Sequence, residues 1–507
     1  MIFSRLHHWA FASALLSSLA MSGAQSQSPS TAHSASSATD SSIFAPLSLP
    51  PAPSTTRSAN GAPGAHYWQN RASYDLQATL DTVTGTIQGS MVLHYTNHSP
   101  QTLDALWFQT EQNRFRNDPA SAGGDSAKAH TYGDIIDQFT EHVNGKAVPV
   151  QLEDHATETK VTLPTPLKPG ATATFTVTWH FTVPVEGDRM DRQGSLYQIA
   201  QWYPRLNVYD DVKGWNIEPY LGQGEFFLEY GDFTMNVTVP ANYVVAATGT
   251  LDNPNDVLTP AEIDRLKQAM TADTVIHVIT ASELTSGAAR PKHDGMVTWK
   301  FHAKDVRDAV WCAAPDYQWD ATHWKGVLVQ AYYRPPAVVT WKEAADMVRM
   351  SIQEYSERWA PYPYPQVTAA EGPVHGMEYP MLSMDATFNN EPRLYLSITH
   401  EVGHEWFPML VGSNERVHQW MDEGVNQFIN TFSNARRYPD RGDQIKRADQ
   451  YRTGIEDAVT QHQDAIIEVP SDSVDGNRYG YIAYFKPAGV LQMLRRDVLG
   501  PELFDKG

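Results

Sequence analysis

The residue pattern of this chain changes once, near residue 310, and the change limits the folds open to it. Before that point, segments such as YDLQATLDTVTGTIQGSMVLHYTNHS alternate loosely between β-branched or aromatic residues and polar ones, with Gly and Asn at the breaks. This pattern is typical of antiparallel strands. Beyond it, short strand-like segments are followed by longer helical ones. We therefore expect a multidomain β plus α+β protein, with an antiparallel β domain over residues 67–310 and an α+β domain over residues 311–507.

The first 66 residues differ from both domains. Arg5 gives a positively charged start, residues 9–21 form a short apolar core, and Ser-Gly-Ala follows at residues 22–24. This order predicts a signal peptide over residues 1–24, with an uncleaved interfacial helix as the alternative. Residues 25–66 are rich in Ser, Ala, Thr and Pro, which predicts a disordered linker. We expect an exported protein, periplasmic or secreted.

Composition excludes several kinds of partner. The 507 residues carry a formal net charge of −20, which argues against a nucleic-acid backbone as the partner. After the predicted signal no segment is apolar and long enough to cross a bilayer, so we expect no stable membrane insertion. The single cysteine, Cys312, cannot form an intramolecular disulfide. We expect it to be a small buried residue and not a catalytic thiol.

The stretch HEVGHEWF carries the strongest chemical signal. It places His400 and His404 four positions apart, on one face of a helix, with Glu401 beside the first. Two imidazoles on one face can bind one zinc ion, and Glu401 can reach a water that the metal polarises. Glu423, in WMDEG, supplies a third ligand and leaves the fourth position open, as in catalytic zinc sites. The pattern predicts one Zn²⁺ per chain. The other interpretation is an amphipathic helix with two surface histidines.

Two segments carry helix-start signals of the capping-box type. Thr259, Pro260 and Glu262 form the first, inside the β domain. Thr340 and Glu343 form the second, which predicts a helix that continues to Trp359.

Four separated motifs, GMEYP, HEVGHEW, WMDEG and YFKPAGVLQML, occur in an order and spacing that resemble the aminopeptidase N-like gluzincin family of zinc metallopeptidases, here an exported bacterial-type member. The resemblance extends from about Tyr67 to the end of the chain. It implies a saddle-like antiparallel β N-terminal domain followed by a thermolysin-like zinc-peptidase domain. Family members continue beyond the point where this sequence stops. The resemblance therefore also implies a catalytic domain that is incomplete at its C-terminus.

The resemblance assigns further roles. Tyr484, in YFKPAG, takes the place of the tyrosine that stabilises the oxyanion, with Glu401 as the general base. Glu378, in GMEYP, takes the place of the carboxylate that binds the free ammonium of the substrate. Gly376 and Met377, in the same motif, are expected to contact the substrate.

Two departures from the family pattern concern substrate binding. His375 stands where the family has Gly, and Tyr379 stands where it has Asn. In the β domain the segment AQWYPRL places Tyr203 where relatives carry a Gln or Glu that also binds the amine, with Gln201 two residues earlier. We therefore expect Glu378 to hold the amine, with Tyr203 and Gln201 as further candidate contacts.

The function expected from the sequence is a zinc-dependent aminopeptidase that removes N-terminal residues from peptides with a free N-terminus. Two alternatives stay open. One is an inactive or impaired interaction module on the same fold, and the other is a gluzincin endopeptidase. The intact catalytic set favours an enzyme over a module. Glu378 argues against an endopeptidase, whose substrates present no ammonium at the cleft.

Overall fold

The computed structural model describes residues 54–59, 61–116, 130–187, 189–440 and 444–507. The chain divides into two compact units, Met1–Gln69 and Asn70–Gly507. In the first, an isolated bridge joins Arg57 to Pro63. The predicted signal peptide lies outside the described residues, and the predicted linker is described only from residue 54 on. All elements named below belong to the second unit.

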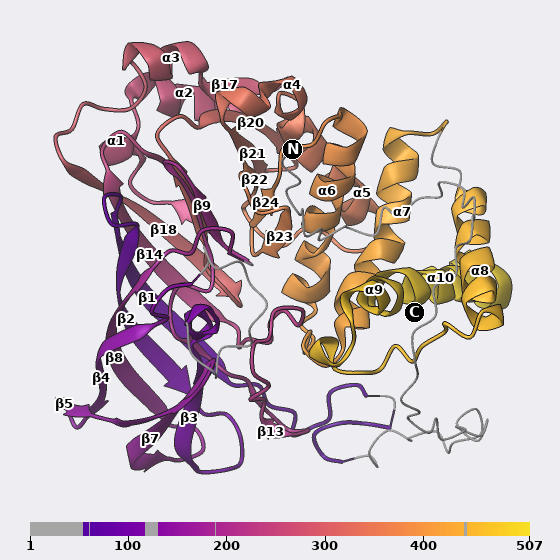
Figure 1. Cartoon of the computed structure of the whole chain (residues 1–507), viewed down its shortest axis with the longest axis horizontal. Helices are drawn as coiled ribbons and strands as arrows, with labels where there is room; N and C mark the ends of the chain where they lie inside the picture. Colours follow the sequence, from indigo (N-terminus) through magenta and orange to yellow (C-terminus); the bar gives the residue numbers. More distant parts are fainter. Residues whose placement is uncertain (1–53, 60, 117–129, 188, 441–443) are drawn as a thin grey trace, which may run out of the picture. The chain divides into compact units, whose positions relative to one another are not determined.

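An eight-stranded sheet forms the larger part of the β region, on the left of Figure 1. Its order is β16-β18-β14-β1-β2-β8-β4-β5, antiparallel throughout except for the parallel pair β1–β14. In β8 every second residue is buried, which explains the sequence alternation. The strands are β1 (Arg71–Asp81), β2 (Thr86–Thr96), β4 (Ile135–Val143), β5 (Lys146–Pro149), β8 (Thr172–Thr182), β14 (Gly231–Pro240), β16 (Thr250–Leu251) and β18 (Met296–Val306).

Three smaller sheets complete the β region. They have the orders β15-β19-β10-β9, β11-β3-β7-β6 and β12-β13. All their pairings are antiparallel, so the expected antiparallel β region is present. Their strands are β3 (Leu103–Gln109), β6 (Gln151–His155), β7 (Glu158–Leu167), β9 (Asp191–Gln193), β10 (Leu196–Ile199), β11 (Arg205–Leu206), β12 (Tyr209–Asp210), β13 (Gly214–Trp215), β15 (Val244–Ala247) and β19 (Trp311–Ala314).

A mixed six-stranded sheet, in the centre of Figure 1, begins the α+β region. Its order is β17-β20-β21-β22-β24-β23, with parallel pairing at β21–β22 and β22–β24. The edge strand β23 carries Glu378. The strands are β17 (Ile276–Ile279), β20 (Gln318–Trp324), β21 (Val327–Tyr333), β22 (Gln366–Glu371), β23 (Gly376–Tyr379) and β24 (Leu382–Asp385).

Helices cover this sheet and extend to the right of Figure 1. Helix α5 packs on β20, β21 and β22, whereas α6 packs on β23 and β24 and against α5 and α7. The helices and helical turns of the region are α4 (Val338–Trp341), α5 (Ala344–Arg358), α6 (Glu391–Gly403), η4 (Glu405–Leu410), η5 (Trp420–Gly424), α7 (Val425–Arg437), α8 (Gln444–Thr460), α9 (Gly476–Tyr479), η7 (Gly480–Phe485), α10 (Lys486–Met493), η8 (Leu494–Leu499) and α11 (Pro501–Lys506).

The two regions are interleaved around the boundary expected at residue 310. Strand β17 precedes that residue but pairs with β20 of the six-stranded sheet. Strand β19 follows it but pairs with β10 and β15 of the β region. The chain therefore enters the six-stranded sheet, returns to the β region and enters the sheet again, which local residue patterns do not reveal.

Of the two capping boxes expected from the sequence, one is present. Thr259 accepts the N–H of Glu262 at the start of α2 (Pro260–Ala269), and the Glu262 carboxylate accepts the N–H of Thr259. The prediction of a capping box at Thr340 is wrong, because α4 has already begun at Val338 and the Thr340 hydroxyl donates to the Ala337 carbonyl. The remaining short helices of the unit are η2 (Glu111–Phe115), α1 (Pro254–Val257), α3 (Ala281–Ser286), η3 (Pro335–Ala337) and η6 (Ser471–Ser473).

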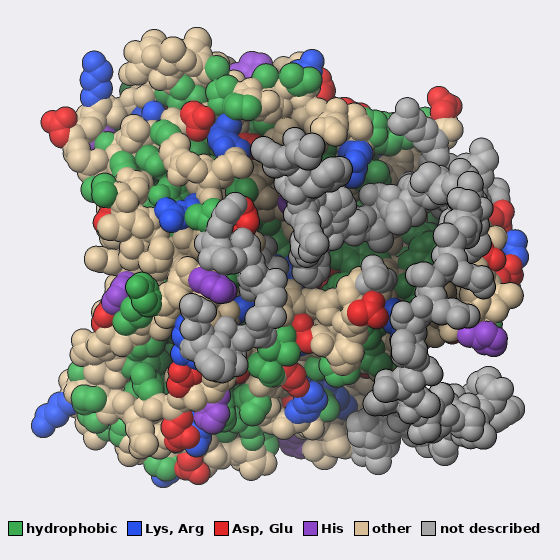
Figure 2. All heavy atoms as spheres, viewed as in Figure 1, with side chains coloured by type: hydrophobic (Ala, Val, Ile, Leu, Met, Phe, Trp, Pro, Cys, Tyr) green, Lys and Arg blue, Asp and Glu red, His purple; other side chains and the backbone are tan. Residues whose placement is uncertain are grey.

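The surface is mixed in charge. Figure 2 shows acidic and basic side chains interspersed over the described part of one face. Among the residues that the structure describes, no helix has the length and apolar character needed to cross a bilayer.

Candidate metal centre

Helix α6 places the two histidines of HEVGH. It begins at Glu391 after the N-cap Asn390, whose side chain accepts the N–H of Arg393 at 3.0 Å. Its C-terminal turns are buried from Ser397 to Gly403. His400 therefore lies inside the helix, and His404 follows it one turn later at the C-cap. Both imidazoles are buried where α6 packs against α7.

The ligand atoms of His400, His404 and Glu423 converge. His400 Nε2 lies 3.2 Å from His404 Nε2 and 3.2 Å from Glu423 Oε2, and His404 Nε2 lies 3.5 Å from Glu423 Oε2. Ligand atoms about 2.1 Å from a tetrahedral zinc lie about 3.4 Å from one another. The three atoms therefore already have the spacing of three zinc ligands, and Glu423 Oε2 is buried without a hydrogen-bond donor.

Hydrogen bonds on the far side of each ring direct the Nε2 atoms to this centre. His400 Nδ1 lies 2.8 Å from Asn430 Oδ1 on α7, and His404 Nδ1 lies 2.8 Å from the Phe407 carbonyl oxygen. Both acceptors favour the tautomer with hydrogen on Nδ1, which leaves the Nε2 lone pairs for a metal. The two rings are thus oriented for joint metal binding.

Glu423 and Tyr484 meet beside the histidines. Glu423 comes from η5, just before α7, and is 2% exposed. Burial alone would raise the pKa of Glu423, but the adjacent imidazoles of His400 and His404 outweigh it and lower that pKa. The Tyr484 hydroxyl, on η7, donates to Glu423 Oε1, and its ring stacks on His400 with centroids 5.8 Å apart. Burial raises the pKa of Tyr484, so its hydroxyl stays a proton donor.

Glu401 lies next to His400 on α6 and is 3% exposed. Burial raises the pKa of its carboxyl well above the usual value, and the negative charges of Glu378 and Asp385 add to the effect. A metal cation in the centre would act in the opposite sense. The side chain thus has the environment of a carboxylate that can gain and release a proton.

A cluster of four buried carboxylates adjoins the centre. Ligand atoms of Glu225, Glu378, Glu415 and Asp422 all lie within 4.8 Å of one another. Glu225 Oε2 and Glu378 Oε1 have no hydrogen-bond donor among the described residues, and Asp422 Oδ1 lies 2.8 Å from His404 Nδ1. Arg189 pairs with Glu225 at 2.6 Å and Arg307 pairs with Glu415 at 2.8 Å, so the negative charges outnumber these two cations. Such a site favours a positively charged group.

Glu225 is one of three residues of this cluster, with Glu415 and Asp422, that the sequence patterns missed. It follows the turn Gly222-Gln223-Gly224, in which Gly222 has φ of +113° and a Cβ on Gly224 would lie 3.1 Å from the Arg416 Cα. Arg416, in the α+β region, holds the backbone of Glu225, since its Nε donates to the Glu225 carbonyl oxygen at 3.2 Å. The signal in the sequence is the GQGEF turn, in which two close glycines precede a carboxylate.

Tyr203 and Gln201, the expected amine contacts in the β region, are both buried. The Tyr203 hydroxyl donates to Asp308 Oδ1 at 2.7 Å, and its ring packs edge-on against Tyr74 with centroids 5.3 Å apart. Gln201 is 2% exposed, and its backbone carbonyl accepts from Gln112. Both are packed within the β region, whereas a carboxylate oxygen of Glu225 lies within 4.8 Å of one of Glu378.

The remaining residues of the GMEYP motif line the same edge strand. Gly376 is half-buried, His375 is exposed and the Met377 sulfur lies 2.9 Å from Arg189 Nη1. The Tyr379 ring stacks on Phe226, next to Glu225, with centroids 6.0 Å apart. Cys312, on β19, is fully buried, which raises the pKa of its thiol and suits a packed residue.

A mixed sheet covered by helices that present two histidines and a glutamate defines a gluzincin-type metallopeptidase fold. Residues 375–507 match the model of the peptidase family M1 domain. This match confirms the resemblance to aminopeptidase N-like gluzincins.

Known proteins resemble the chain over different lengths. Aminopeptidase M1-B of Oryza sativa subsp. japonica is 24% identical over 198 residues, which cover 36% of this chain and 22% of that protein. Glutamyl aminopeptidase of Sus scrofa is 26% identical over 125 residues, 24% of this chain and 13% of that one. The matched part thus spans less than a quarter of either relative.

Among solved structures, the M1 zinc metallopeptidase from Deinococcus radiodurans superposes with a TM-score of 0.56 at 18% identity, covering 88% of this chain and 86% of that one. A mutant of that enzyme bound to a Tyr-Ser-Ala substrate gives a TM-score of 0.54 with 88% and 87% covered. These likenesses confirm the expected fold class, a β domain followed by a thermolysin-like domain.

Proposed function

We propose that the protein is an exported, zinc-dependent aminopeptidase that removes N-terminal residues from peptides with a free N-terminus. The observation that carries the proposal is the juxtaposition of two sites. Three ligand atoms with tetrahedral zinc spacing lie beside buried carboxylates that lack donors. His404 joins the two sites, because its Nε2 faces Glu423 and its Nδ1 lies 3.9 Å from Glu378 Oε1.

One zinc ion held by His400, His404 and Glu423 would supply a Lewis acid that polarises the scissile carbonyl and acidifies water. Glu401 accepts a proton from the attacking water as its oxygen bonds to the carbonyl carbon. It then returns that proton to the leaving nitrogen as the C–N bond breaks. The high pKa that burial gives its carboxyl suits this second step.

Tyr484 stabilises the oxygen of the scissile carbonyl. As negative charge develops there, the hydroxyl turns from Glu423 Oε1 to donate to that oxygen. The distance it must cover is short, because Glu423 is itself a member of the ligand set. Gly376 and Met377, on the edge strand that carries Glu378, contact the substrate backbone.

Glu378 and Glu225 hold the substrate amine. Glu378 Oε1 and Glu225 Oε2 are buried and lack donors. One carboxylate oxygen of each residue lies within 4.8 Å of the other, which suits an ammonium between the two side chains. An ammonium fixed at this point places the first peptide bond, and no later one, near the catalytic groups. A tripeptide is the substrate bound in one of the similar structures, which supports a peptide of this kind.

A panel of aminoacyl chromogenic substrates, assayed with and without a chelator, tests the proposal. We expect chelator-sensitive release of the first residue, restoration by one equivalent of zinc, and no cleavage of the N-acetylated counterparts. Cleavage of acetylated peptides at internal bonds would instead show an endopeptidase. Full zinc occupancy without hydrolysis of any peptide would show an inactive module. Detection of the processed chain outside the cytoplasm tests the export.

A further inference from the structure

Arg189 contacts Glu225 and both chain neighbours of Glu378, the two carboxylates to which the amine is assigned. Its Nη1 donates to Glu225 Oε1 at 2.6 Å and lies 2.9 Å from the Met377 sulfur. Its backbone carbonyl accepts the Tyr379 hydroxyl at 3.0 Å. The two residues that flank Glu378 in the strand are therefore both tied to Arg189, as is Glu225 itself.

The second terminal nitrogen of Arg189 fixes the turn that precedes Glu225. Nη2 donates to the carbonyl oxygens of Gly222 at 3.1 Å and Gln223 at 3.2 Å. Each terminal nitrogen thus contacts two groups of the protein, and the side chain is only 14% exposed. A guanidinium occupied in this way is suited to hold other groups in place and not to bind substrate.

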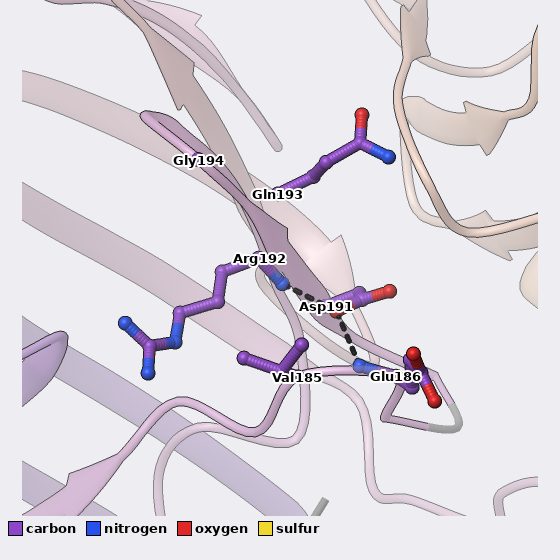
Figure 3. A pocket seen from close by; sticks show the side chains of 6 residues that line it. All are labelled: Val185, Glu186, Asp191, Arg192, Gln193 and Gly194. Carbon is purple, nitrogen blue, oxygen red and sulfur yellow. Dashed lines mark hydrogen bonds between the residues drawn. The ribbon is translucent and has the colours of Figure 1, made fainter. Parts of the chain in front are cut away.

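The segment that carries Arg189 is itself held by short-range contacts. Asp191 Oδ1 accepts the N–H of Glu186 at 2.9 Å and the N–H of Arg192 at 2.7 Å, as Figure 3 shows. Arg192 lies on the same segment, but its guanidinium packs against Gly85 and away from the carboxylates. The chain therefore provides two neighbouring arginines, of which Arg189 contacts Glu225.

We infer that Arg189 is a positioning residue for amine recognition, which holds Glu225 at the distance from Glu378 that an α-ammonium requires. The inference rests on the proposed function. The ion pair engages Oε1 of Glu225 and leaves Oε2, which has no donor, for the substrate. Without Arg189 the carboxylate of Glu225 would be free to turn, and the amine would lose one of its two partners.

A purely electrostatic role for Arg189 would predict the opposite change in KM. If Arg189 acted only as a positive charge near the site, it would repel the ammonium, and its removal would lower KM. We expect Arg189→Met to raise KM for a free-amine aminoacyl substrate by about 10-fold or more with little change in kcat. Arg189→Lys keeps one charged donor for Glu225 and should recover part of the loss. Arg192→Met should behave as the unmodified protein.

A pair of zinc-binding inhibitors separates positioning from general damage. L-leucine hydroxamate carries the α-amine, and 4-methylpentanohydroxamate is the same molecule without it. On the zinc-loaded full chain, Arg189→Met should weaken the first about 10-fold and leave the second unchanged. Equal weakening of both inhibitors, a fall in KM, or an Arg189→Met variant indistinguishable from Arg192→Met would overturn the inference. If the unmodified protein cleaves no aminoacyl substrate and binds both inhibitors equally, the proposed function itself fails.

Discussion

The imidazole of His400 is supported by a neutral amide, because its Nδ1 lies 2.8 Å from Asn430 Oδ1. Asn430 is itself held on α7, since its Nδ2 donates to the Tyr355 hydroxyl at 3.0 Å and to Asn426 Oδ1 at 2.9 Å. His404 differs, because a carboxylate oxygen of Asp422 lies 2.8 Å from its Nδ1 in addition to the Phe407 carbonyl. A carboxylate therefore supports only the His404 ring, and the Asn430 amide must orient the His400 ring.

Asn430→Ala should therefore weaken zinc binding. Without the amide, His400 can rotate and lose the tautomer that presents Nε2, and loss of such an outer partner costs about 10–100-fold in metal affinity. Equilibrium competition with a chromogenic chelator measures the effect. Asn430→Asp gives the ring a charged acceptor and should bind zinc at least as tightly as the unmodified protein.

Gln427→Ala is the matched control for Asn430. Gln427 lies on the same helix but is only half-buried, and its side chain donates to the Tyr451 hydroxyl. Its zinc affinity should be unchanged. An equal affinity for Asn430→Ala and Gln427→Ala would show that the amide does not orient the ring.

Glu401→Gln should remove activity and keep the metal. The amide has nearly the same shape but cannot take a proton from water, so kcat should fall by about 10²–10⁴-fold or more. Zinc content and melting temperature should stay at the values of the unmodified protein, because Glu401 is not among the three converging ligands. A variant that lost its zinc together with its activity would assign Glu401 to the ligand set.

Tyr484→Phe should lower kcat by about 100-fold and leave KM within a few-fold, because the hydroxyl is needed only when charge develops on the carbonyl oxygen. Tyr481→Phe is the control. It lies on the same helical turn, but its hydroxyl donates to Asp464 Oδ1 at 2.9 Å, away from Glu423. If the two variants had the same kcat, Tyr484 would be a packing residue.

Local patterns were sufficient for the parts of the molecule that short-range geometry determines. The alternation in β8 and the spacing of His400 and His404 each follow from a regular element of the backbone. Glu423 could be found because a fixed number of residues connects it to HEVGH. The resemblance added Glu378 and Tyr484, which the structure brings to the same centre.

Contacts between distant segments could not be found in this way. Glu225 and Glu378 are 153 residues apart in the numbering, and neither the GQGEF turn nor β23 carries a pattern that points to the other. The segment AQWYPRL predicts that Tyr203, just before its proline, contacts the amine. In the structure the ring of Tyr203 packs against Tyr74 in the aromatic core. Which group lies next to a buried carboxylate depends on how several sheets pack together. The spacing of residues along the sequence carries no information about that packing.

The last prediction concerns stability and pH. Glu229 is 3% exposed, its Oε1 has no donor, and burial raises the pKa of its carboxyl to about 8. The folded state therefore binds the proton more tightly than the unfolded state, whose pKa is about 4.3. The resulting contribution to the free energy of unfolding is complete below about pH 4. It is lost as pH rises towards 8, by about 1.4 kcal/mol for each pH unit.

Glu229→Gln removes the ionisable group and should melt higher than the unmodified protein by an amount that grows with pH, to about 5 °C at pH 8. Melting curves of both proteins from pH 5 to pH 9 measure the difference. Glu283→Gln supplies a control of opposite sign, because hydrogen bonds from Arg265 lower the pKa of Glu283 to about 2. Its stability should be slightly below that of the unmodified protein at neutral pH and should converge with it as pH falls through the range from about 4 to 2. A constant difference between Glu229→Gln and the unmodified protein at all pH values would show that Glu229 keeps its charge in the folded state.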